Sequence, residues 1–526
     1  MTDPAARPGA PLRAWRRPPW LAAALATVVV LACAMTSITP DPIGVFWDDG
    51  VYLLTAKALA AGDGYRYTYL PGAPPAIHYP PLFPLLLAAV LKVTPPFPDN
   101  VAVLKLLNPL LLAMGVFGTV RLAVRNLGLA PVPVAITVAI SAVIAPVLVV
   151  ANVLFSESLF FAALVGAIAL VDAAIARGGV GRAAIAGLAV AALALVRTIG
   201  GVLLPAAFLQ LWGRRRRREA FALAIVTVVL LAPWQWWVWQ SSRGFPDELR
   251  GFYGPYLEWV IGGYLREPAL AVQVLARNAG DLWRAFGVLF APRLPRALQW
   301  VAAAMALASL GAGLVTLLRR ASVTAAFVLL YGVVVLFWPY NPERFIWAVW
   351  PLLALLLLAA ARDVGAALAH RWPPATRAAT LTFALLLAGQ AVYASRGLAG
   401  GWAGAPQAAM TRRIWPLVTW TAAHTSPDDI VASDAHVMVA LYAGRKTIPV
   451  SMLTPTEHVR DKPLTAQARE LGALTGRFHP KVLVLSDGLP QLDAIPLWAA
   501  QDGAPVIHAL PAIAGGGAAF ALRERQ

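Results

Sequence analysis

The sequence predicts an all-α polytopic membrane protein with about eleven transmembrane helices and a small C-terminal α/β domain outside the membrane. Three observations support this fold class: 59% of the 526 residues are hydrophobic, only 13% are charged, and long apolar runs alternate with arginine-rich loops. A soluble domain has about 45–50% apolar and about 25% charged residues, so this chain cannot cover itself with polar surface. The single cysteine, Cys33, excludes an intramolecular disulfide.

A membrane-spanning helix needs about 20 apolar residues, or about 17 at the short end. Eleven segments are candidates: 19–38, 101–120, 131–151, 154–176, 183–196, 199–212, 220–239, 298–318, 321–338, 345–361 and 378–395. The short segments 183–196 and 199–212 are either two spans or one broken helix. The proline-rich run 80–94 is shorter still, so we expect it to be interfacial or re-entrant rather than spanning.

Positive charge in short loops marks the cytoplasmic side of a membrane protein. With a cytoplasmic N-terminus and one crossing per segment, the inner segments contain 18 basic and four acidic residues, whereas the outer segments of the membrane part contain 14 and 12. The inner basic residues are Arg7, Arg13, Arg16, Arg17, Arg121, Arg125, Arg177, Arg182, Arg214, Arg215, Arg216, Arg217, Arg218, Arg319, Arg320, Arg362, Arg371 and Arg377. The run at 214–218 predicts an anchor at the lipid headgroups. Arginine exceeds lysine by 37 to six, which is typical of a GC-rich bacterial genome, so we expect a multi-pass protein of the bacterial cytoplasmic (inner) membrane.

The distribution of charge argues against a nucleic-acid partner, although the net charge is +17. After residue 403 the chain contains 11 basic and 10 acidic residues. The excess of positive charge therefore lies among the hydrophobic segments, where membrane topology explains it.

Two domains are expected. Residues 1–397 form the membrane domain, with outer loops at 39–100 and 240–297, and the aromatic residues of the second loop predict interfacial helices. Residues 398–526 form an extracytoplasmic α/β domain, because short β-like runs alternate there with helical stretches. These runs are 428–434, 446–450 and 481–487, and the glycine-rich end of the chain predicts a turn and one last strand.

The strongest candidate for chemistry is the stretch FWDDGVYLLTAKALAAGDGY at 46–65, where Asp48 and Asp49 follow the first span. Apolar residues at helical spacing predict that a helix after the pair lies along the membrane face. A carboxylate there can act as general base on an acceptor hydroxyl or amine, and two carboxylates can bind a divalent cation. The structural alternative is that Asp49 caps this helix.

A second candidate is HYPPLFPLLLA at 78–88, where two prolines begin a short apolar helix. We expect His78 and Tyr79 at the level of the lipid headgroups, either as substrate contacts or as interfacial anchors.

Three more ionisable residues lie at the predicted outer ends of spans. Glu157 follows an apolar stretch in NVLFSESLFF at 152–161, and it is either functional or a helix cap. Arg197 and Arg344 have no topological purpose on the outer side, and a guanidinium there can bind a lipid phosphate. Arg344 has Glu343 beside it, so a simple ion pair is the alternative.

No nucleotide-dependent energy source is visible in the sequence. It has no P-loop, no Rossmann fingerprint and no HExxH zinc helix. The energy for any reaction must therefore come from an activated substrate.

The order of the motifs resembles the GT-C superfamily, polytopic glycosyltransferases that use polyprenyl-phosphate sugars. The matching motifs are the Asp pair, A-x-x-L-x-x-G-x-x-Y at 56–65, Y-P-P-L at 79–82, S-E-S-L-F-F at 156–161, L-x-R-T-x-G-x-x-L-x-P at 195–205 and E-R-F-x-x-x-x-W-P-L-L at 343–353. The likeness covers about residues 19–362 and is greatest to the bacterial branch of protein mannosyltransferases, aminoarabinose transferases and Rhizobium galacturonosyltransferases. The C-terminal part resembles the small outer domain often appended to such enzymes.

The resemblance implies a GT-C-like arrangement of helices and roles for the acidic residues. It implies that Asp48 is the catalytic base, that Asp49 is the second acid of the pair, and that Glu157 lies near the active site or a metal. Branches of the superfamily differ in metal use, so a divalent ion is left open, with Asp48, Asp49 and Glu157 as its ligands if one is used.

The resemblance also implies the substrates. Arg344 occupies the position of an arginine near the lipid phosphate, and His78 and Tyr79 occupy the loop that contacts the donor. The implied reaction transfers a sugar, with inversion, from a polyprenyl-phosphate donor to an envelope lipid, glycan or protein on the outer face of the membrane.

Two other classes of function are compatible with the sequence. A transporter or flippase of lipid-linked sugars would share the spans and the outer arginines, although transporters usually place ionisable groups near the middle of the bilayer. A non-catalytic assembly partner would use the C-terminal domain as its binding module.

Overall fold

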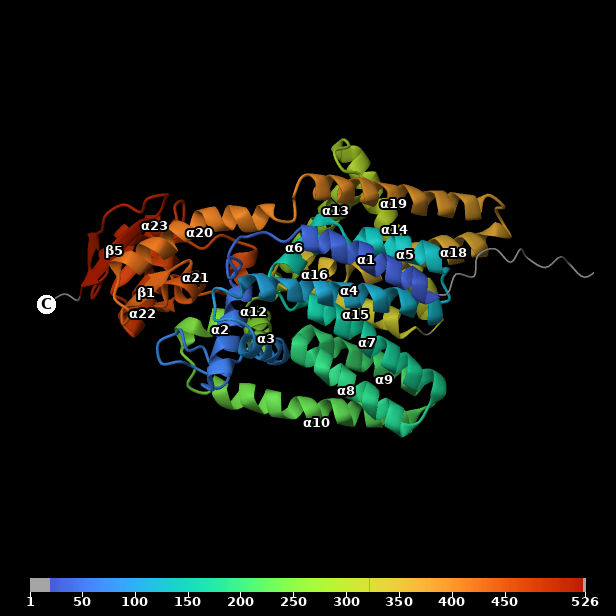
Figure 1. Ribbon diagram of the computed structural model, residues 1–526, viewed down its shortest axis with the longest axis horizontal. Coiled ribbons are helices and arrows are strands. Elements are labelled where there is room, and N and C mark those ends of the chain that lie inside the picture. The colour runs from blue at the N-terminus through green and yellow to red at the C-terminus, as the bar shows by residue number, and fades with distance from the viewer. Residues whose placement is uncertain (1–18, 321, 524–526) are drawn as a thin grey trace, which may run out of the picture.

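Apolar helices form most of the structure, a computed structural model that describes residues 19–320 and 322–523 (Figure 1). By length and composition, six helices of the described chain can each cross a membrane. They are α4 (Val101–Arg125), α7 (Glu157–Arg177), α10 (Arg217–Ser242), α14 (Arg296–Arg319), the continuous pair α17 (Trp350–Leu353) and α18 (Leu355–Ala369), and α19 (Ala375–Ala399). α10 leaves Ile225, Val228 and Val229 exposed, and such an apolar face suits lipid better than water. The predicted polytopic membrane fold is confirmed.

The remaining predicted spans are bent or short. Segment 131–151 is not one straight helix, because α5 (Pro131–Ala142) and α6 (Ala145–Asn152) meet at 64°. Pro146 lacks the N–H that would donate to the carbonyl of Ala142, where α5 ends. The pair can form a seventh crossing. Four other segments form shorter apolar helices: α1 (Pro19–Thr36), α8 (Val180–Val196), α9 (Leu203–Gly213) and α15 (Val323–Leu336).

The predicted span at 345–361 begins too early. A separate helix, α16 (Pro342–Ala348), precedes the crossing helix, which starts at Trp350. Pro351 lies in the first turn of that helix, where its missing N–H costs no hydrogen bond.

Segment 183–212 forms two helices. Arg197 has an extended backbone after α8, and a short 3₁₀ turn, η1 (Thr198–Val202), leads into α9. Gly200 packs against Leu193, and a Cβ atom at position 200 would lie 2.8 Å from the Leu193 carbonyl oxygen. Residues seven apart cannot be this close in a continuous helix, so the chain reverses direction at Arg197.

The predicted inner loops gather at one end of the bundle. Arg216 donates to the carbonyl of Ala174 at 3.3 Å, and Arg320 pairs with Asp363 at 2.8 Å. The α/β domain lies at the other end (Figure 1). Which end faces the cytoplasm stays a prediction, and Arg7, Arg13, Arg16 and Arg17 lie outside the described residues.

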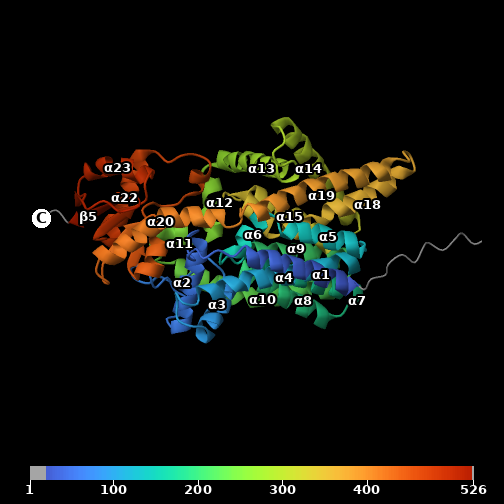
Figure 2. The ribbon, with the colours of Figure 1, turned by 45° about the horizontal axis from the view of Figure 1, so that its top comes forward.

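The two outer segments form helices between the bundle and the α/β domain (Figures 1 and 2). These helices are α2 (Asp48–Ala61), α3 (Leu82–Val93), η2 (Asp247–Leu249), α11 (Arg250–Tyr253), α12 (Tyr256–Arg266) and α13 (Pro268–Phe290). The expectation that α2 lies along the membrane face is wrong. Its residues Val51, Tyr52 and Leu53 are buried, because α3 and the α/β domain pack on it. The run 80–94 contains α3, which is too short to span a membrane.

The C-terminal region contains the predicted sheet. The strands are β1 (Ile430–Ser433), β2 (Lys446–Ile448), β3 (Val482–Leu485), β4 (Val506–Ala509) and β5 (Ala518–Arg523), in the order β2-β1-β3-β5-β4. Strands β2, β1 and β3 are parallel, and β5 is antiparallel to both of its neighbours. The helical elements are α20 (Ala405–His424), α21 (His436–Met438), the π-helical turn η3 (Val439–Ala443), η4 (Pro455–His458), α22 (Leu464–Phe478) and α23 (Pro490–Ala499). The three β-like runs and the last strand are confirmed, whereas β4 is an addition to the prediction.

The α/β domain is docked on the outer helices by close backbone contacts. The Thr447 N–H donates to the Tyr69 carbonyl at 2.9 Å. Gly251 of α11 lies against Leu453, and a Cβ atom at 251 would lie 1.9 Å from the Leu453 carbonyl oxygen. Only glycine permits this approach.

We predict that Gly251→Ala destabilises the protein by about 1–3 kcal/mol, because a backbone carbonyl cannot rotate out of the way. Gly262→Ala is the matched control, since its methyl group would meet only the flexible end of Arg266, at 3.5 Å. Thermal unfolding of the purified protein in detergent measures the difference. Equal unfolding temperatures for the two variants would contradict the close packing.

Candidate active site

Four predicted site residues from distant parts of the chain form one ion-pair network. Arg344 donates from Nη1 to Asp48 Oδ2 at 2.5 Å and from Nε to Glu157 Oε1 at 2.6 Å. Arg197 Nη1 lies 2.7 Å from the same Glu157 oxygen. The alternative that Arg344 is paired with its neighbour Glu343 is not what the structure has.

Helix ends bring these side chains together. Asp48 and Glu157 are the first residues of α2 and α7, and Arg344 lies in the first turn of α16. Arg197 directly follows the last residue of α8. Carboxylates are favoured at helix N-termini by the helix dipole, so the two acids suit their positions.

Burial separates the roles of the four residues. The side chain of Glu157 is fully buried and that of Arg197 is 13% exposed, whereas Asp48 and Arg344 are 17% and 28% exposed. Two carboxylates and two guanidiniums compensate one another, as buried charges require. Asp48 and Arg344 therefore have the most solvent-accessible side chains of the network. Glu157 pairs with both arginines in the protein interior.

Aromatic rings support both guanidiniums. The guanidinium carbon of Arg344 lies 3.8 Å from the centroid of the Phe155 ring, and that of Arg197 lies 5.4 Å from the centroid of Phe345. Cation–π contacts of this kind are worth about 0.5–2 kcal/mol. Each arginine is thus held by both a carboxylate and a ring.

Tyr79 contacts the network directly and is not an interfacial anchor. Its side chain is buried, and its hydroxyl donates to Asp48 Oδ1 at 2.5 Å. Burial and the neighbouring Asp48 carboxylate raise the pKa of Tyr79 well above its usual value, so the phenol stays protonated and donates. Both oxygens of Asp48 therefore have partners, Tyr79 on one side and Arg344 on the other.

His78 is also buried inside the protein, so its side chain does not contact lipid, whereas its level relative to the headgroups stays a prediction. Its Nδ1 lies 2.7 Å from the Gly254 carbonyl, so Nδ1 carries the proton, and its ring lies against Tyr256 with centroids 3.8 Å apart. Burial lowers the pKa of His78 to about 4, so the ring is neutral at pH 7. The outer segment at 240–297 covers the residue, which the sequence alone does not reveal.

Asp49 holds the loop that precedes α2. Its carboxylate accepts from the backbone N–H groups of Gly44 at 2.6 Å and Phe46 at 3.1 Å, and the residue has no exposed surface. Burial raises the pKa of Asp49 to about 6. The expectation that Asp49 caps the helix is wrong in position, because α2 already begins at Asp48 and Trp47 is its N-cap residue.

Two polar residues of the site were missed by the sequence analysis. The hydroxyl groups of Tyr52 and Ser156 lie 3.0 Å apart, and Arg197 donates to Ser156 at 3.1 Å. A signal for Tyr52 was present, because it lies four residues after Asp48 and such residues share one helix face. Ser156 directly precedes Glu157, at the boundary where α7 begins.

The acidic residues do not fit a metal ion as they stand. The oxygens of Asp49 accept backbone N–H groups, and Arg344 lies between Asp48 and Glu157. Within residues 19–320 and 322–523, no group of three histidine, cysteine, aspartate or glutamate residues could hold a metal. The Arg344 guanidinium occupies the space between the Asp48 and Glu157 carboxylates, where a metal ion would have to bind. No step below therefore uses a metal.

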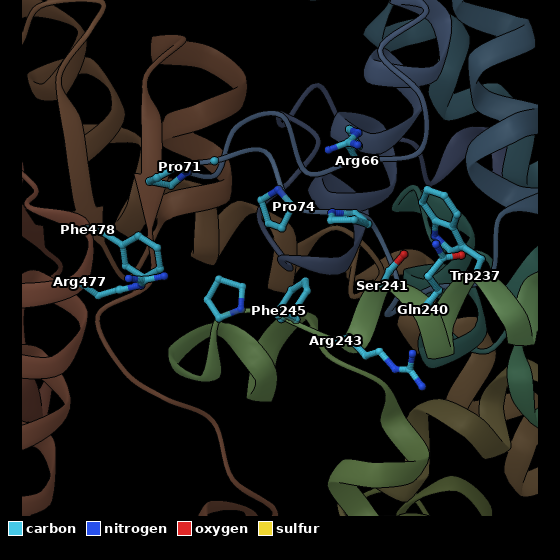
Figure 3. Close-up of a pocket in the computed structure, with 14 residues that line it drawn as sticks. Arg66, Pro71, Pro74, Trp237, Gln240, Ser241, Arg243, Phe245, Arg477 and Phe478 are labelled. Atoms are coloured by element: carbon cyan, nitrogen blue, oxygen red, sulfur yellow. The ribbon is translucent and has the colours of Figure 1, made fainter.

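A separate pocket of about 680 Å³ is lined by residues of both outer segments and of the α/β domain, and none of its lining residues belongs to the ion-pair network. Arg66, Arg243 and Arg477 reach it from three separate segments (Figure 3). No aspartate or glutamate lines it. Trp237 connects pocket and site, because it lines the pocket and donates from Nε1 to the carbonyl of Ala76, two residues before His78.

Comparisons with known proteins match this chain to solved structures alone. No known protein family and no curated protein matches the sequence. Among solved structures, the crystal structure of ArnT from Cupriavidus metallidurans in the apo state is similar with a TM-score of 0.48 and 16% identity, covering 96% of this chain and 98% of that chain. The structure of the same protein bound to undecaprenyl phosphate is similar with a TM-score of 0.44 and 16% identity, covering 96% and 99%.

We predict that Glu157→Gln destabilises the protein by about 3–5 kcal/mol, because it leaves two largely buried guanidiniums without their shared carboxylate. Glu258→Gln is the control, since the side chain of Glu258 is 64% exposed and its ion pair with Arg250 is on the surface. Thermal unfolding in detergent measures both variants. An unfolding temperature of Glu157→Gln equal to that of the control would mean that the network is not a structural unit.

Proposed function

We propose that the chain is an integral membrane glycosyltransferase of the GT-C type. It moves a sugar from a polyprenyl-phosphate donor to an envelope lipid, glycan or protein on the outer face of the bacterial cytoplasmic membrane. The observation that carries the proposal is the partly exposed Asp48 carboxylate, held between the Tyr79 hydroxyl and the Arg344 guanidinium. The motifs described above, which resemble the GT-C superfamily, contain all four residues of the ion-pair network: Asp48, Glu157, Arg197 and Arg344.

Asp48 is the general base in this proposal. The acceptor oxygen attacks the anomeric carbon from the face opposite the phosphate, and its proton passes to an Asp48 oxygen. The bond between the anomeric carbon and the phosphate oxygen breaks, polyprenyl phosphate leaves, and the configuration inverts. Asp48 suits this role better than Glu157 or Asp49, because those two side chains are fully buried and a general base must reach the proton that it takes.

Arg344 binds the donor phosphate and stabilises its developing charge. Its Nη2 atom is buried and has no hydrogen-bond partner within the described chain, so one donor is available for a phosphate oxygen. Glu157 and the Phe155 ring keep the guanidinium in place. When the phosphate binds, Arg344 exchanges Asp48 for the phosphate, and Asp48 Oδ2 becomes free to accept the proton.

The basic pocket of Figure 3 favours an acceptor that carries negative charge. Three arginines and no aspartate or glutamate line this pocket, and such a lining attracts phosphate or carboxylate groups. The pocket volume is within the range of about 300–1,000 Å³ that is usual for small-ligand sites. An anionic headgroup bound there would lie next to the loop that carries Tyr79.

The two alternative functions predict different consequences of removing the carboxylate. A flippase would move lipid-linked sugar across vesicles without making a new glycosidic bond. An assembly partner would retain its role after loss of Asp48 but not after loss of the α/β domain. Both alternatives are outcomes of the experiment that follows.

We predict that Asp48→Asn lowers sugar transfer by a factor of about 10²–10⁴, the usual contribution of a general base. The host gene is deleted and complemented with the wild type, Asp48→Asn or Asp63→Asn. Intact-mass spectrometry then compares envelope glycans and polyprenyl-phosphate sugars. Asp63 is a suitable control because it is an exposed aspartate of the same outer segment.

Under this proposal a sugar disappears from one glycan and its lipid donor accumulates in the deletion strain and with Asp48→Asn, whereas the wild type and Asp63→Asn restore both. Full restoration by Asp48→Asn would refute Asp48 as the base and would favour the flippase or the assembly partner.

We predict that Arg344→Lys weakens binding of undecaprenyl phosphate by about tenfold, because lysine keeps the positive charge but cannot form the bidentate hydrogen bonds of a guanidinium. Arg284→Lys is the control, since that side chain is 71% exposed and pairs with Asp281 on the surface. Native mass spectrometry of the purified protein with undecaprenyl phosphate measures the affinity. Equal affinity of the two variants would remove Arg344 from the phosphate site.

A further inference from the structure

A strained turn places Asp48 at the start of α2. Trp47 has φ 67° and ψ −63°, and the Asp48 N–H donates across it to the Phe46 carbonyl at 2.8 Å. This is the rare form of the three-residue γ-turn. A bulky residue at positive φ is costly, and it persists only where the surroundings hold it.

The α/β domain supplies the group that holds Trp47. His436, the first residue of α21, lies 3.2 Å from Trp47 Nε1 through its own Nε2. The indole N–H can only donate, so Nε2 of His436 is the acceptor and the ring proton is on Nδ1. The Tyr253 hydroxyl lies 2.7 Å from the same nitrogen and therefore donates to it as well. The two donors share the single lone pair of Nε2, with the Tyr253 hydroxyl the nearer of the two, and His436 in this way joins Trp47 to the outer segment at 240–297.

The rest of the loop is also tied to the same part of the α/β domain. The Ile43 N–H donates to the Tyr442 hydroxyl at 3.0 Å. Gly50, in the first turn of α2, lies so close to Val437 that a Cβ atom there would be 2.3 Å from a Val437 methyl carbon. The segment at 436–442 therefore contacts both sides of the γ-turn.

Four rings contact Trp47. Its ring lies 5.5 and 5.4 Å from those of Phe252 and Tyr253, and 6.1 and 6.3 Å from those of His78 and Tyr79, between centroids. These rings belong to the two outer segments, whereas the side-chain hydrogen bond of the indole comes from the α/β domain. A cavity of about 310 Å³, which Trp47 helps to line, lies between the loop and that domain.

We propose that His436 is a positioning residue of the active site, and that the α/β domain uses it, through Trp47, to set the orientation of Asp48. This inference rests on the proposed function and gives the α/β domain a part in the reaction. His436 does not touch the reacting atoms. Its hydrogen bond keeps the γ-turn closed, and the turn directs the Asp48 carboxylate between Tyr79 and Arg344.

The test compares variants that remove or retain the acceptor. His436→Leu removes it, whereas His436→Gln retains it, because the glutamine amide oxygen reaches the position of Nε2. Trp47→Phe removes the donor and keeps an aromatic ring, although a smaller one, among the four neighbouring rings. Sugar transfer is assayed with membranes of the deletion strain, which accumulate the lipid donor, and undecaprenyl phosphate affinity is measured on each purified variant.

We expect His436→Leu and Trp47→Phe each to lower kcat by at least about tenfold, because small displacements of a catalytic group are costly. The double variant should lose no more than either single one, since both remove the same hydrogen bond. His436→Gln should retain most of the activity. The affinity for undecaprenyl phosphate should stay unchanged, because Arg344 is still held by Glu157.

Unchanged kcat in Trp47→Phe and His436→Leu, with Asp48→Asn inactive, would overturn this inference and leave the proposed function intact. Additive losses in the double variant would overturn it too, because they would indicate two separate structural defects. Should His436→Leu fail to fold, Trp47→Phe and His436→Gln decide the question alone. Activity of Asp48→Asn would instead refute the proposed function itself.

Discussion

The shared pairing of Glu157 with Arg197 and Arg344 is the interaction on which the outer end of the bundle depends. Its carboxylate is fully buried and is reached by one guanidinium from the end of α8 and by another from the start of α16. A buried charge must be compensated where it lies. The end of α8 and the start of α16 therefore have to lie at the same level as the start of α7. Asp48 joins the network through Arg344. The position of Asp48 thus depends on the pairing of Glu157 with Arg197 and Arg344.

The remaining structure protects this arrangement from both sides. On the side of the helix bundle, breaks between helices allow several helix ends to meet. The chain bends between α5 and α6 near Pro146, and it reverses direction at Arg197. From the other side, the outer segment at 240–297 covers Tyr79 and His78. Within the network Arg344 and Asp48 have the most exposed side chains, at 28% and 17%, and Glu157 has none.

The sequence predicts the parts of this site better than their connections. Asp48, Glu157, Arg197 and Arg344 are recognisable individually, because an ionisable residue at the end of an apolar helix is costly without a purpose. Their mutual pairing is not predictable from spacing, since residues 48 and 344 are far apart in the chain. The burial of His78 is not predictable from the sequence for the same reason. Gly254 and Tyr256, which cover this residue, belong to another outer segment. The bend at Pro146 had a local signal, whereas the contact of His436 with Trp47 depends on how a separate domain docks.

We propose that Arg344 and Asp48 face the donor phosphate and the acceptor at one point. A cryo-electron microscopy structure of the protein with undecaprenyl phosphate bound tests this arrangement. We expect the phosphate within hydrogen-bonding distance of the Arg344 guanidinium, with that guanidinium moved off Asp48 Oδ2 and with Glu157 still paired. A phosphate bound in the pocket of Arg66, Arg243 and Arg477, with the pair of Arg344 and Asp48 intact, would contradict it.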